Sequence, residues 1–243
     1  MSQWNELIEK QDWRGRIPFI LRRTIKGKIW KRVKFREVDI YEHNFMDCQF
    51  LNCAFEHCRI GNNVTYDNCL WQNCSFSGQY SSLGSPAVYR NCRFVETKFK
   101  NGLWSNLVFD NCLFSGEFAN VYWEGRWADS GKPNLQFSKC DMQAATFKNV
   151  TIKNGLTLDS ILLPKTGLRL FDNNNEAFTN ALLKGVEAAQ DDARISLKVM
   201  ADFAEGQHPV LYDDTHLDHH PGIRGTDSRE AFESIAKAFE LRR

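Results

Sequence analysis

The sequence is 243 residues long, 42% of it hydrophobic and 25% charged, with a formal net charge of +1. A chain of this length forms one or two domains. It contains no apolar run long enough to cross a bilayer and no hydrophobic region of a signal peptide. These features argue against a helical membrane protein and predict a cytoplasmic one. The charge is uneven, because residues 1–36 carry 11 Lys/Arg and 3 Asp/Glu, a net +8 that leaves −7 for the rest.

A basic segment opens the chain, and we expect residues 1–32 to form an N-terminal cap. Its Lys and Arg residues, among them Arg22 and Arg23, alternate with apolar residues such as Trp30. In a repeat protein such apolar residues can cover an open core while the charges stay solvated. The same segment could also steer an acidic protein partner toward the chain. The two roles are compatible, and direct nucleic-acid binding is not expected.

A five-residue repeat follows, from residue 33 to residue 163. All eight cysteines precede a large apolar side chain by two residues, and most are separated by multiples of five. The pairs are Cys48/Phe50, Cys53/Phe55, Cys58/Ile60, Cys69/Trp71, Cys74/Phe76, Cys92/Phe94, Cys112/Phe114 and Cys140/Met142. The pattern continues without cysteine at Val33/Phe35, Val38/Ile40, Thr97/Phe99, Gly102/Trp104, Leu107/Phe109, Ala145/Phe147, Val150/Ile152 and Ser160/Leu162. A period of five fits neither a helix nor a single strand, so it indicates a repeat architecture.

Each five-residue unit is predicted to be a very short strand followed by a corner. The two residues of a pair lie two apart, so both point to the same side of the strand, here the interior. The residue before the cysteine is Asn or Asp in six of the eight units. Asn and Asp tolerate turn conformations and can bond to their own backbone. A small thiol beside a large ring lets neighbouring layers interlock at close-packed density.

The stretch from Cys48 to Ile60 resembles consecutive units of the pentapeptide-repeat family, whose motif is a small residue, a polar residue, Leu or Phe, and two loosely defined positions. Here Asn precedes the small residue more often than it follows it. The resemblance implies a mainly β fold, a right-handed quadrilateral β-helix with four units per turn and the Phe-type side chains stacked in the core. Such a solenoid would have about six coils and a length of about 30 Å at the usual strand spacing.

The cysteines are expected to be reduced packing residues. Each occupies a periodic interior position at which Ala and Val also occur, and no CxxC pair is present. Structural zinc sites usually draw on such closely spaced pairs. Reduced thiols also agree with a cytoplasmic protein. Disulfide or metal chemistry is the alternative, but no cofactor or metal is predicted.

Three breaks interrupt the repeat, where the cysteine spacing becomes 11, 18 and 28 residues. The first is one residue too long at Gly61–Asn63, which predicts a bulge at a corner. The second contains the Gly- and Ser-rich segment 77–86, which predicts an extruded loop. The third, between Cys112 and Cys140, predicts another loop. Loops on a rigid scaffold often carry function.

The third break contains a cluster that we predict to bind a partner. Its members are Tyr122, Trp123, Arg126 and Trp127, and Arg22 and Arg23 of the basic segment are added as steering residues. Aromatic and Arg side chains concentrate binding energy at protein interfaces. Trp127 shares its phase with the pair Leu135/Phe137 and with Cys140, and could point inward, in which case Trp123 could not. The alternative is that these aromatic residues fold back on the wall of the solenoid.

Residues 164–243 are predicted to form a helical C-terminal cap or extension. Between about 174 and 204, apolar residues recur at helical spacing. These are Phe178, Leu182, Val186 and Ala189. A second helix is predicted after the capping box of Asp227 and Glu230, with Phe232, Ile235 and Phe239 on one face. The helices would cover the open end of the solenoid, where unpaired edges invite aggregation. They could also form a homodimer surface.

A polar stretch between these helices is rich in His and Asp. It contains His208, Asp213, Asp214, His216, Asp218, His219 and His220. Such residues can bind a metal, which would make the C-terminal third a metal-dependent enzyme. Flanking Pro and Gly residues instead favour a solvated loop without the fixed geometry of a helical metal motif. No phosphate loop, dinucleotide fingerprint or nucleophile elbow occurs, so an enzyme is not expected.

The leading functional hypothesis is a non-catalytic scaffold that binds another protein through its wall and inserted loops. The partner could be a toxin, a regulatory factor or a secretion apparatus. The resemblance supplies an alternative, because some members of the family protect type II topoisomerases from quinolones or toxins by mimicking DNA. Mimicry needs a wall dense in Asp and Glu, whereas the outward positions here mix Lys and Arg with a similar number of acids.

Overall fold

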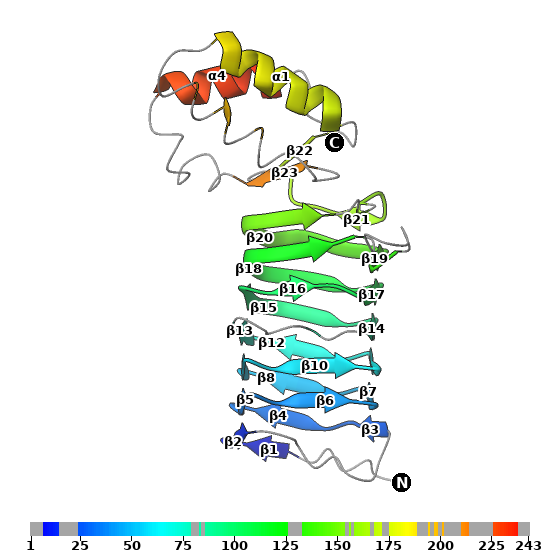
Figure 1. Ribbon diagram of the computed structural model, residues 1–243. Helices are drawn as coiled ribbons and strands as arrows, with labels where there is room; N and C mark the ends of the chain where they lie inside the picture. The colour runs from blue at the N-terminus through cyan, green and yellow to red at the C-terminus, as the bar shows by residue number, and fades with distance from the viewer. Residues whose placement is uncertain are drawn as a thin grey trace.

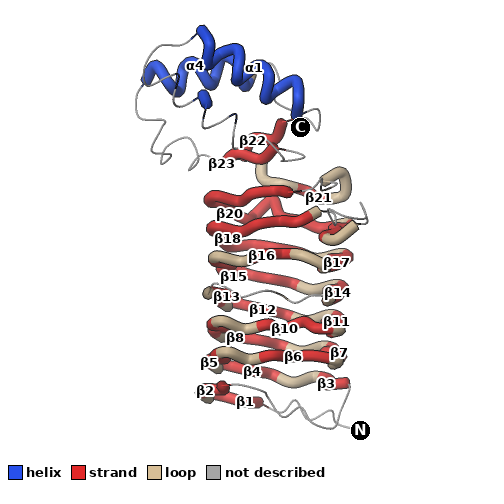
Figure 2. Tube along the Cα trace, in the orientation of Figure 1, coloured by secondary structure: helices blue, strands red, loops and turns tan. Residues whose placement is uncertain are grey.

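The computed structural model shows a four-sided coil of parallel strands, followed by a small C-terminal unit that contains two helices (Figure 1). The description covers residues 7–14, 24–78, 83, 86–125, 133–153, 156, 158–165, 168–171, 175–188, 194, 197–198, 201, 210–213 and 226–237. The helices α1 and α4 lie beyond the last coil, at the end opposite the first strands (Figure 2). No helix in this part of the chain is long and apolar enough to cross a membrane.

The strands form four walls. We number the walls in the order in which the chain passes through them within one complete coil, starting at β3. The first wall consists of β3 (Thr24–Lys26), β7 (Asn44–Met46), β11 (Val64–Asp67), β14 (Ala87–Arg90), β17 (Leu107–Asp110) and β19 (Leu135–Ser138). The second consists of β1 (Leu7–Glu9), β4 (Ile29–Lys31), β8 (Gln49–Leu51), β12 (Leu70–Gln72), the first parts of β15 (Arg93–Lys100), β18 (Leu113–Glu124) and β20 (Cys140–Lys153), and β21 (Ile161–Leu162).

Three long strands turn corners without a break: β15 runs from the second wall into the third, and β18 and β20 run through the third into the fourth. The third wall consists of β2 (Asp12–Arg14), β5 (Lys34–Arg36), β9 (Ala54–Glu56), β13 (Ser75–Ser77) and the following parts of β15, β18 and β20. The fourth consists of β6 (Asp39–Tyr41), β10 (Arg59–Asn62), β16 (Leu103–Trp104) and the last parts of β18 and β20. We count the coil that holds β1 and β2 as the first, so β19 and β20 belong to the seventh.

Coil length follows the five-residue period. On the second wall the inward rings of Trp30, Phe50, Trp71, Phe94 and Phe114 are in register, at intervals of 20, 21, 23 and 20 residues. Four units of five therefore make one coil, and the longer intervals mark the insertions. The mainly β solenoid predicted from the repeat is confirmed.

Stacked aromatic rings fill the interior. On the third wall the ring of Phe55 lies between those of Phe35 and Phe76, with centroids 4.6 Å apart on both sides. Trp71 continues the corresponding stack on the second wall, 4.6 Å from Phe94. Parallel stacking follows from the register, because each strand places its inward ring directly over the one in the preceding coil. Burial of these rings supplies the main stabilisation of the solenoid.

All eight cysteines are buried free thiols, as the repeat predicts. Each thiol donates a weak hydrogen bond to the carbonyl of the preceding coil; Cys58 Sγ, for example, lies 3.3 Å from the oxygen of Phe35. Burial raises the pKa of the Cys58 thiol to about 11. The thiols are therefore small packing groups whose only polar atom is satisfied by the backbone.

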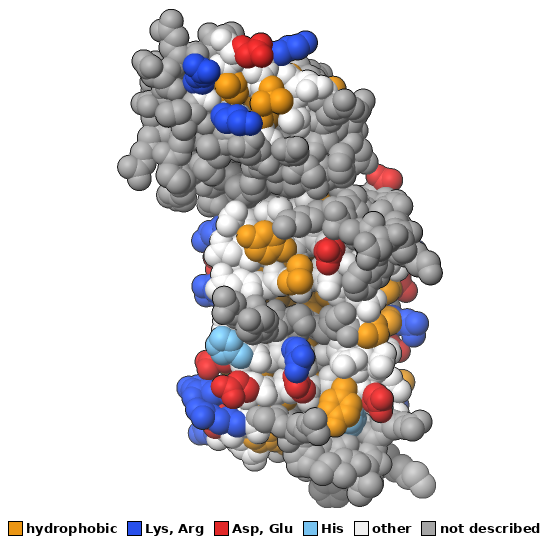
Figure 3. All heavy atoms as spheres, viewed as in Figure 1, with side chains coloured by type: hydrophobic (Ala, Val, Ile, Leu, Met, Phe, Trp, Pro, Cys, Tyr) orange, Lys and Arg blue, Asp and Glu red, His pale blue; other side chains and the backbone are white. Residues whose placement is uncertain are grey.

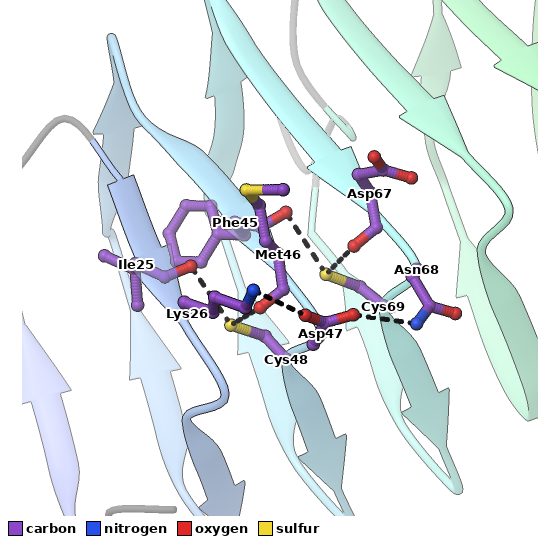
Figure 4. A network of polar contacts seen from close by, with 9 residues as sticks. All are labelled: Ile25, Lys26, Phe45, Met46, Asp47, Cys48, Asp67, Asn68 and Cys69. Carbon is purple, nitrogen blue, oxygen red and sulfur yellow. Dashed lines mark hydrogen bonds and ion pairs between the residues drawn. The ribbon is translucent and has the colours of Figure 1, made fainter. Parts of the chain in front are cut away.

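Every residue that precedes a cysteine adopts a left-handed backbone conformation. The φ angles lie between 51° and 55° for Asp47, Asn52, His57, Asn68, Asn73, Asn91, Asn111 and Lys139. This confirms the corner role inferred from the Asn and Asp residues, whose side chains also connect neighbouring coils. Asn68 Nδ2 donates to Asp47 Oδ1 at 2.8 Å, and Asp47 also lies 3.6 Å from Lys26 Nζ (Figure 4).

The solenoid begins earlier than predicted. Strands β1 to β4 lie within residues 1–32, the segment assigned to a basic cap, and β1 pairs with β4 in parallel. The inward rings continue the five-residue spacing back through Trp30 to Ile25, which is buried. Sequence reasoning missed these units because Lys28 stands where later units have a cysteine. A boundary at residue 33 therefore does not mark the start of the coil.

The breaks in the repeat have different structures. The register of β10 on β6 shifts between Arg59 and Asn62, which confirms the predicted bulge. In the segment predicted to be an extruded loop, Leu83 is buried and its carbonyl accepts a hydrogen bond from Tyr89 Oη. Leu83 therefore faces the interior of the fourth coil.

The last predicted unit is out of phase by one residue. The inward pair is Ile161 and Leu163, whereas Leu162, which was predicted to be inward with Ser160, is 56% exposed. A turn explains the shift, because the Ile161 amide donates to the carbonyl of Leu158 at 3.1 Å.

The C-terminal unit contains α1 (Asn175–Ala188), α4 (Thr226–Ala236) and an antiparallel pair of strands, β22 (Leu168–Phe171) and β23 (Val210–Asp213). The strand β23 contacts β20 of the seventh coil. Both helices were predicted; α1 itself ends at Ala188, and the described residues 194, 197–198 and 201 of the predicted region are also helical. The strand pair was not predicted, because β23 lies inside the stretch that was interpreted as a polar loop.

Candidate protein-binding surface

Two exposed side chains lie next to each other on the fourth wall. Leu103 of β16 and Tyr122 of β18 are register partners and are 52% and 44% exposed. They point outward because their chain neighbours, Trp104 and Trp123 among them, point inward. Hydrophobic side chains gather on this face over the upper coils (Figure 3). We call Leu103 and Tyr122 the apolar pair.

The corner beside the apolar pair is held by a ladder of asparagine side chains. Asn101 and Asn120 have left-handed φ angles of 56° and 54°. Asn120 Nδ2 donates to Asn101 Oδ1 at 3.1 Å, and Asn149 Nδ2 donates to Asn120 Oδ1 at 2.8 Å. Because these bonds cross three coils, they fix where β16 and β18 begin on the fourth wall.

An insertion starts just after the wall that carries Tyr122. The structure describes the chain up to Gly125 and again from residue 133. The Gly125 carbonyl accepts a hydrogen bond from the amide of Asn134 at 2.8 Å. Asn134 is buried, and its Nδ2 donates to Glu124 Oε2 at 3.3 Å. The two ends of the insertion are therefore clamped together at the edge of the fourth wall.

The predicted partner-binding residues have different outcomes. Tyr122 is exposed, as a binding residue must be. Trp123 is fully buried, so its prediction as a partner-binding residue is wrong. The register that placed Trp127 inward, and so Trp123 outward, was counted backward from Phe137 across the insertion, whereas counting forward by five from Phe118 places Trp123 inward. The other four residues, Arg126, Trp127, Arg22 and Arg23, lie outside the described residues.

Sequence reasoning missed Leu103 as a surface residue. Its signal was present, because Gly102/Trp104 was recognised as an inward pair and the residue between such a pair must point outward. Nothing in the repeat showed that Tyr122 occupies the same position one coil later. The spacing of 19 residues between them, one short of a full coil, obscured the relation.

Several charged side chains on the walls pair with opposite charges of neighbouring coils. Arg59 makes two hydrogen bonds of 2.8 Å to the carboxylate of Asp39. Lys148 Nζ lies 3.0 Å from Glu117 Oε1, and this hydrogen bond lowers the pKa of Glu117. Exposed ion pairs of this kind contribute little stability, but they remove net charge from the wall.

The basic segment is neutralised in the same way where it is described. Arg36 lies between Asp12 and Glu56, at 3.7 and 3.2 Å. Lys31 and Arg32 both approach Glu9, at 3.8 and 3.9 Å. The positive charges of the second coil thus face acids of the first and third coils, and the local positive field is weaker than the sequence count indicates.

Within the described ranges, no group of three or more His, Cys, Asp or Glu side chains is placed to hold a metal ion. Of the His/Asp stretch, only Asp213 is described, and it lies in β23. The remaining members of that stretch lie outside the described residues.

Four parallel walls, five-residue sides and stacked inward rings define the chain as a four-sided β-solenoid built from five-residue repeats. A scan against protein-family models and a search of the curated proteins find no match. Among solved structures, the chain is similar to a trypsin-treated variant of QnrB1, a plasmid-mediated fluoroquinolone resistance protein. The identity is 14% and the TM-score 0.32, over 59% of this chain and 91% of that one. A second trypsin-treated QnrB1 variant matches with 12% identity and a TM-score of 0.24, over 61% and 90%.

Proposed function

We propose that the protein is a non-catalytic scaffold that binds another protein with the apolar pair of the fourth wall and the insertion after Gly125. The observation that carries this proposal is the exposure of Leu103 and Tyr122 side by side on a rigid sheet. Large apolar and aromatic side chains supply most of the energy of protein interfaces. A rigid wall also loses little conformational entropy when a partner binds.

A site on the solenoid is favoured over one on the C-terminal helices. Leu182 of α1 and Phe232 of α4 are buried within the chain, so these two side chains are already engaged before any partner or second copy arrives. The predicted homodimer through these helices, and the predicted cytoplasmic localisation, stay predictions.

A capture experiment with matched variants tests the proposal. The tagged protein would be used to capture proteins from a lysate of its native host, with quantitative mass spectrometry as the readout. We expect Leu103→Ala with Tyr122→Ala to reduce capture of the partner at least tenfold, which corresponds to about 1.4 kcal/mol. The control, Lys98→Ala with Lys100→Ala, changes two outward residues of the third wall and should capture normally. Equal capture by both double variants would contradict the proposed site.

Protection of a topoisomerase by DNA mimicry is the second candidate, and QnrB1 is described as a fluoroquinolone resistance protein. Against mimicry stand the ion pairs, such as Arg59 with Asp39, which leave no wall of dense negative charge in the described part of the solenoid. We expect the protein not to shield DNA gyrase from a quinolone in a supercoiling assay. Robust protection at stoichiometric protein would refute this charge argument.

A metal-dependent activity in the C-terminal third also stays a prediction. Replacing His216, His219 and His220 together by Ala should change neither the metal content of the purified protein nor its stability. Stoichiometric zinc or iron that is lost in this variant would instead support a metal site.

A further inference from the structure

The second wall carries few charges. In the second to sixth coils its outward residues are Ile29, Lys31, Gln49, Leu51, Leu70, Gln72, Arg93, Val95, Leu113 and Ser115. Two of these ten are charged. The corresponding outward residues of the third wall are Lys34, Arg36, Ala54, Glu56, Ser75, Ser77, Lys98, Lys100, Glu117 and Ala119, of which six are charged. The second wall is therefore the easier of the two to remove from water.

The apolar residues of this wall alternate between its two outward positions. The apolar residue is the first of the three strand residues in the second, fourth and sixth coils, and the last of the three in the third and fifth coils. Their order along the solenoid is Ile29, Leu51, Leu70, Val95 and Leu113, and each is at least partly exposed. The resulting zigzag is symmetric about Leu70, so the pattern of apolar positions is the same in both directions along the solenoid. We call these five residues the apolar zigzag.

We propose that two copies of this chain pack through their second walls. They are related by a two-fold axis that lies between the two walls, over β12 and parallel to it. Such an axis reverses the order of the coils in the second copy but keeps the position of each residue along its strand. Each apolar residue of the zigzag therefore faces an apolar residue of the second copy. Leu70 would face Leu70 of the second copy, and Ile29 would face its Leu113. Leu51 would face Val95. An isologous interface requires this kind of self-complementary pattern.

The polar residues are compatible with the same arrangement. Arg93 of one copy would face Gln49 of the other, and Lys31 would face Ser115, so no like charges oppose each other. Gln72 would face itself, and two primary amides can exchange hydrogen bonds. The ion pair of Lys31 with Glu9 at 3.8 Å lies at the edge and need not be broken.

Other two-fold arrangements of this wall fit the sequence poorly. An axis parallel to the solenoid would place each apolar residue on the polar residue of the same coil, for example Leu70 on Gln72. Moving the first axis by half a coil would place Leu70 on Arg93. The alternating pattern therefore selects one register.

The interface is expected to be weak. Ten outward residues on each side are fewer than the roughly 20–30 of a standard interface. The pairing of apolar residues also ends beyond these five coils, because Leu7 of the first coil would face Asp141 in the seventh coil of the second copy. A reversible dimer that forms at micromolar concentrations is the expected consequence. It uses a different wall from the apolar pair, so it does not depend on the proposed function.

Sedimentation velocity of the full chain over two decades of micromolar concentration tests the proposal. We expect a monomer–dimer equilibrium that Leu70→Lys weakens at least tenfold, because it would place two ammonium groups opposite each other on the axis. The matched control is Leu103→Lys, an outward leucine of the fourth wall, which should dimerise normally. Circular dichroism and urea unfolding of both variants check that the solenoid is intact.

A second pair of variants tests the register. Gln49→Glu should strengthen the dimer several-fold, because the new carboxylate would face Arg93 of the second copy at two symmetric places. Gln49→Lys should weaken the dimer by a similar factor. A protein that stays monomeric throughout, a dimer indifferent to Leu70→Lys, or equal effects of the two Gln49 variants would each overturn the proposal. A dimer that survives all of these changes would lie elsewhere, for instance on the C-terminal helices.

Discussion

Replacing Trp123 by Ala should destabilise the protein strongly, although sequence reasoning placed this residue at the surface. The indole is fully buried, and the rings of Trp104, Phe118, Phe137 and Phe147 lie around it with centroids between 5.4 and 6.1 Å away. Truncating a buried Phe or Trp to Ala usually costs about 3–5 kcal/mol.

One feature of the site lowers that cost. Among the described residues Trp123 Nε1 has no hydrogen-bond partner. Burying an unpaired donor costs about 1–3 kcal/mol, and removing the indole relieves this penalty. We therefore expect a loss near the lower limit, about 3 kcal/mol. Trp123→Phe should cost less than Trp123→Ala, because it removes the unpaired donor and keeps most of the packing.

Urea unfolding of Trp123→Ala, Trp123→Phe and Tyr122→Ala would measure these differences. Tyr122 is the matched control, since it is the next residue along β18 and points outward. Its truncation should cost less than about 0.5 kcal/mol. If Trp123→Ala and Tyr122→Ala have equal small effects, the inward register of β18 is wrong.

Two further predictions concern the corners and the thiols. Asn52 has a φ of 55°, so Asn52→Ala should cost about 1 kcal/mol and Asn52→Gly almost nothing, because only Gly avoids the steric penalty of the left-handed region; equal losses in urea unfolding would argue against backbone strain. Burial raises the pKa of Cys58 from 9.0 to about 11, so the folded protein keeps this proton at a pH where the unfolded chain loses it. The resulting stability is fully present below pH 9 and is lost as pH rises toward 11, by up to roughly 3 kcal/mol. The unfolding free energy should therefore fall less between pH 8 and pH 10 in Cys58→Ala than in the wild type. The same fall in both proteins would contradict this account.

The interior of the solenoid could be predicted from sequence because a single rule acts at every coil. Phe55 and Trp71 are inward for the same reason, namely that a ring two residues after a small side chain stacks on the ring of the preceding coil. The rule also gives the corner conformation, since Asn and Asp are enriched where φ is positive. Local sequence and tertiary packing agree here, so the pattern is sufficient.

The outward surface could not be predicted in the same way. Whether Tyr122 lies beside Leu103 depends on the unit between Phe114 and Phe118, which has four residues instead of five and so removes one residue from the coil. The phase of Trp123 cannot be recovered by counting backward from Phe137, because the segment between them is not a multiple of five residues long. Non-local register of this kind is set by packing between coils, and no local motif encodes it.

The buried tryptophans have a spectroscopic consequence. Trp30, Trp71, Trp104 and Trp123 are each at most 1% exposed and belong to the second, fourth, fifth and sixth coils. Each coil of a solenoid contacts only its neighbours, so the coils can separate in sequence rather than all together. An indole that leaves this aromatic interior for water shifts its fluorescence to longer wavelength. Variants that retain one of these four indoles would therefore show, coil by coil, from which end the protein unravels.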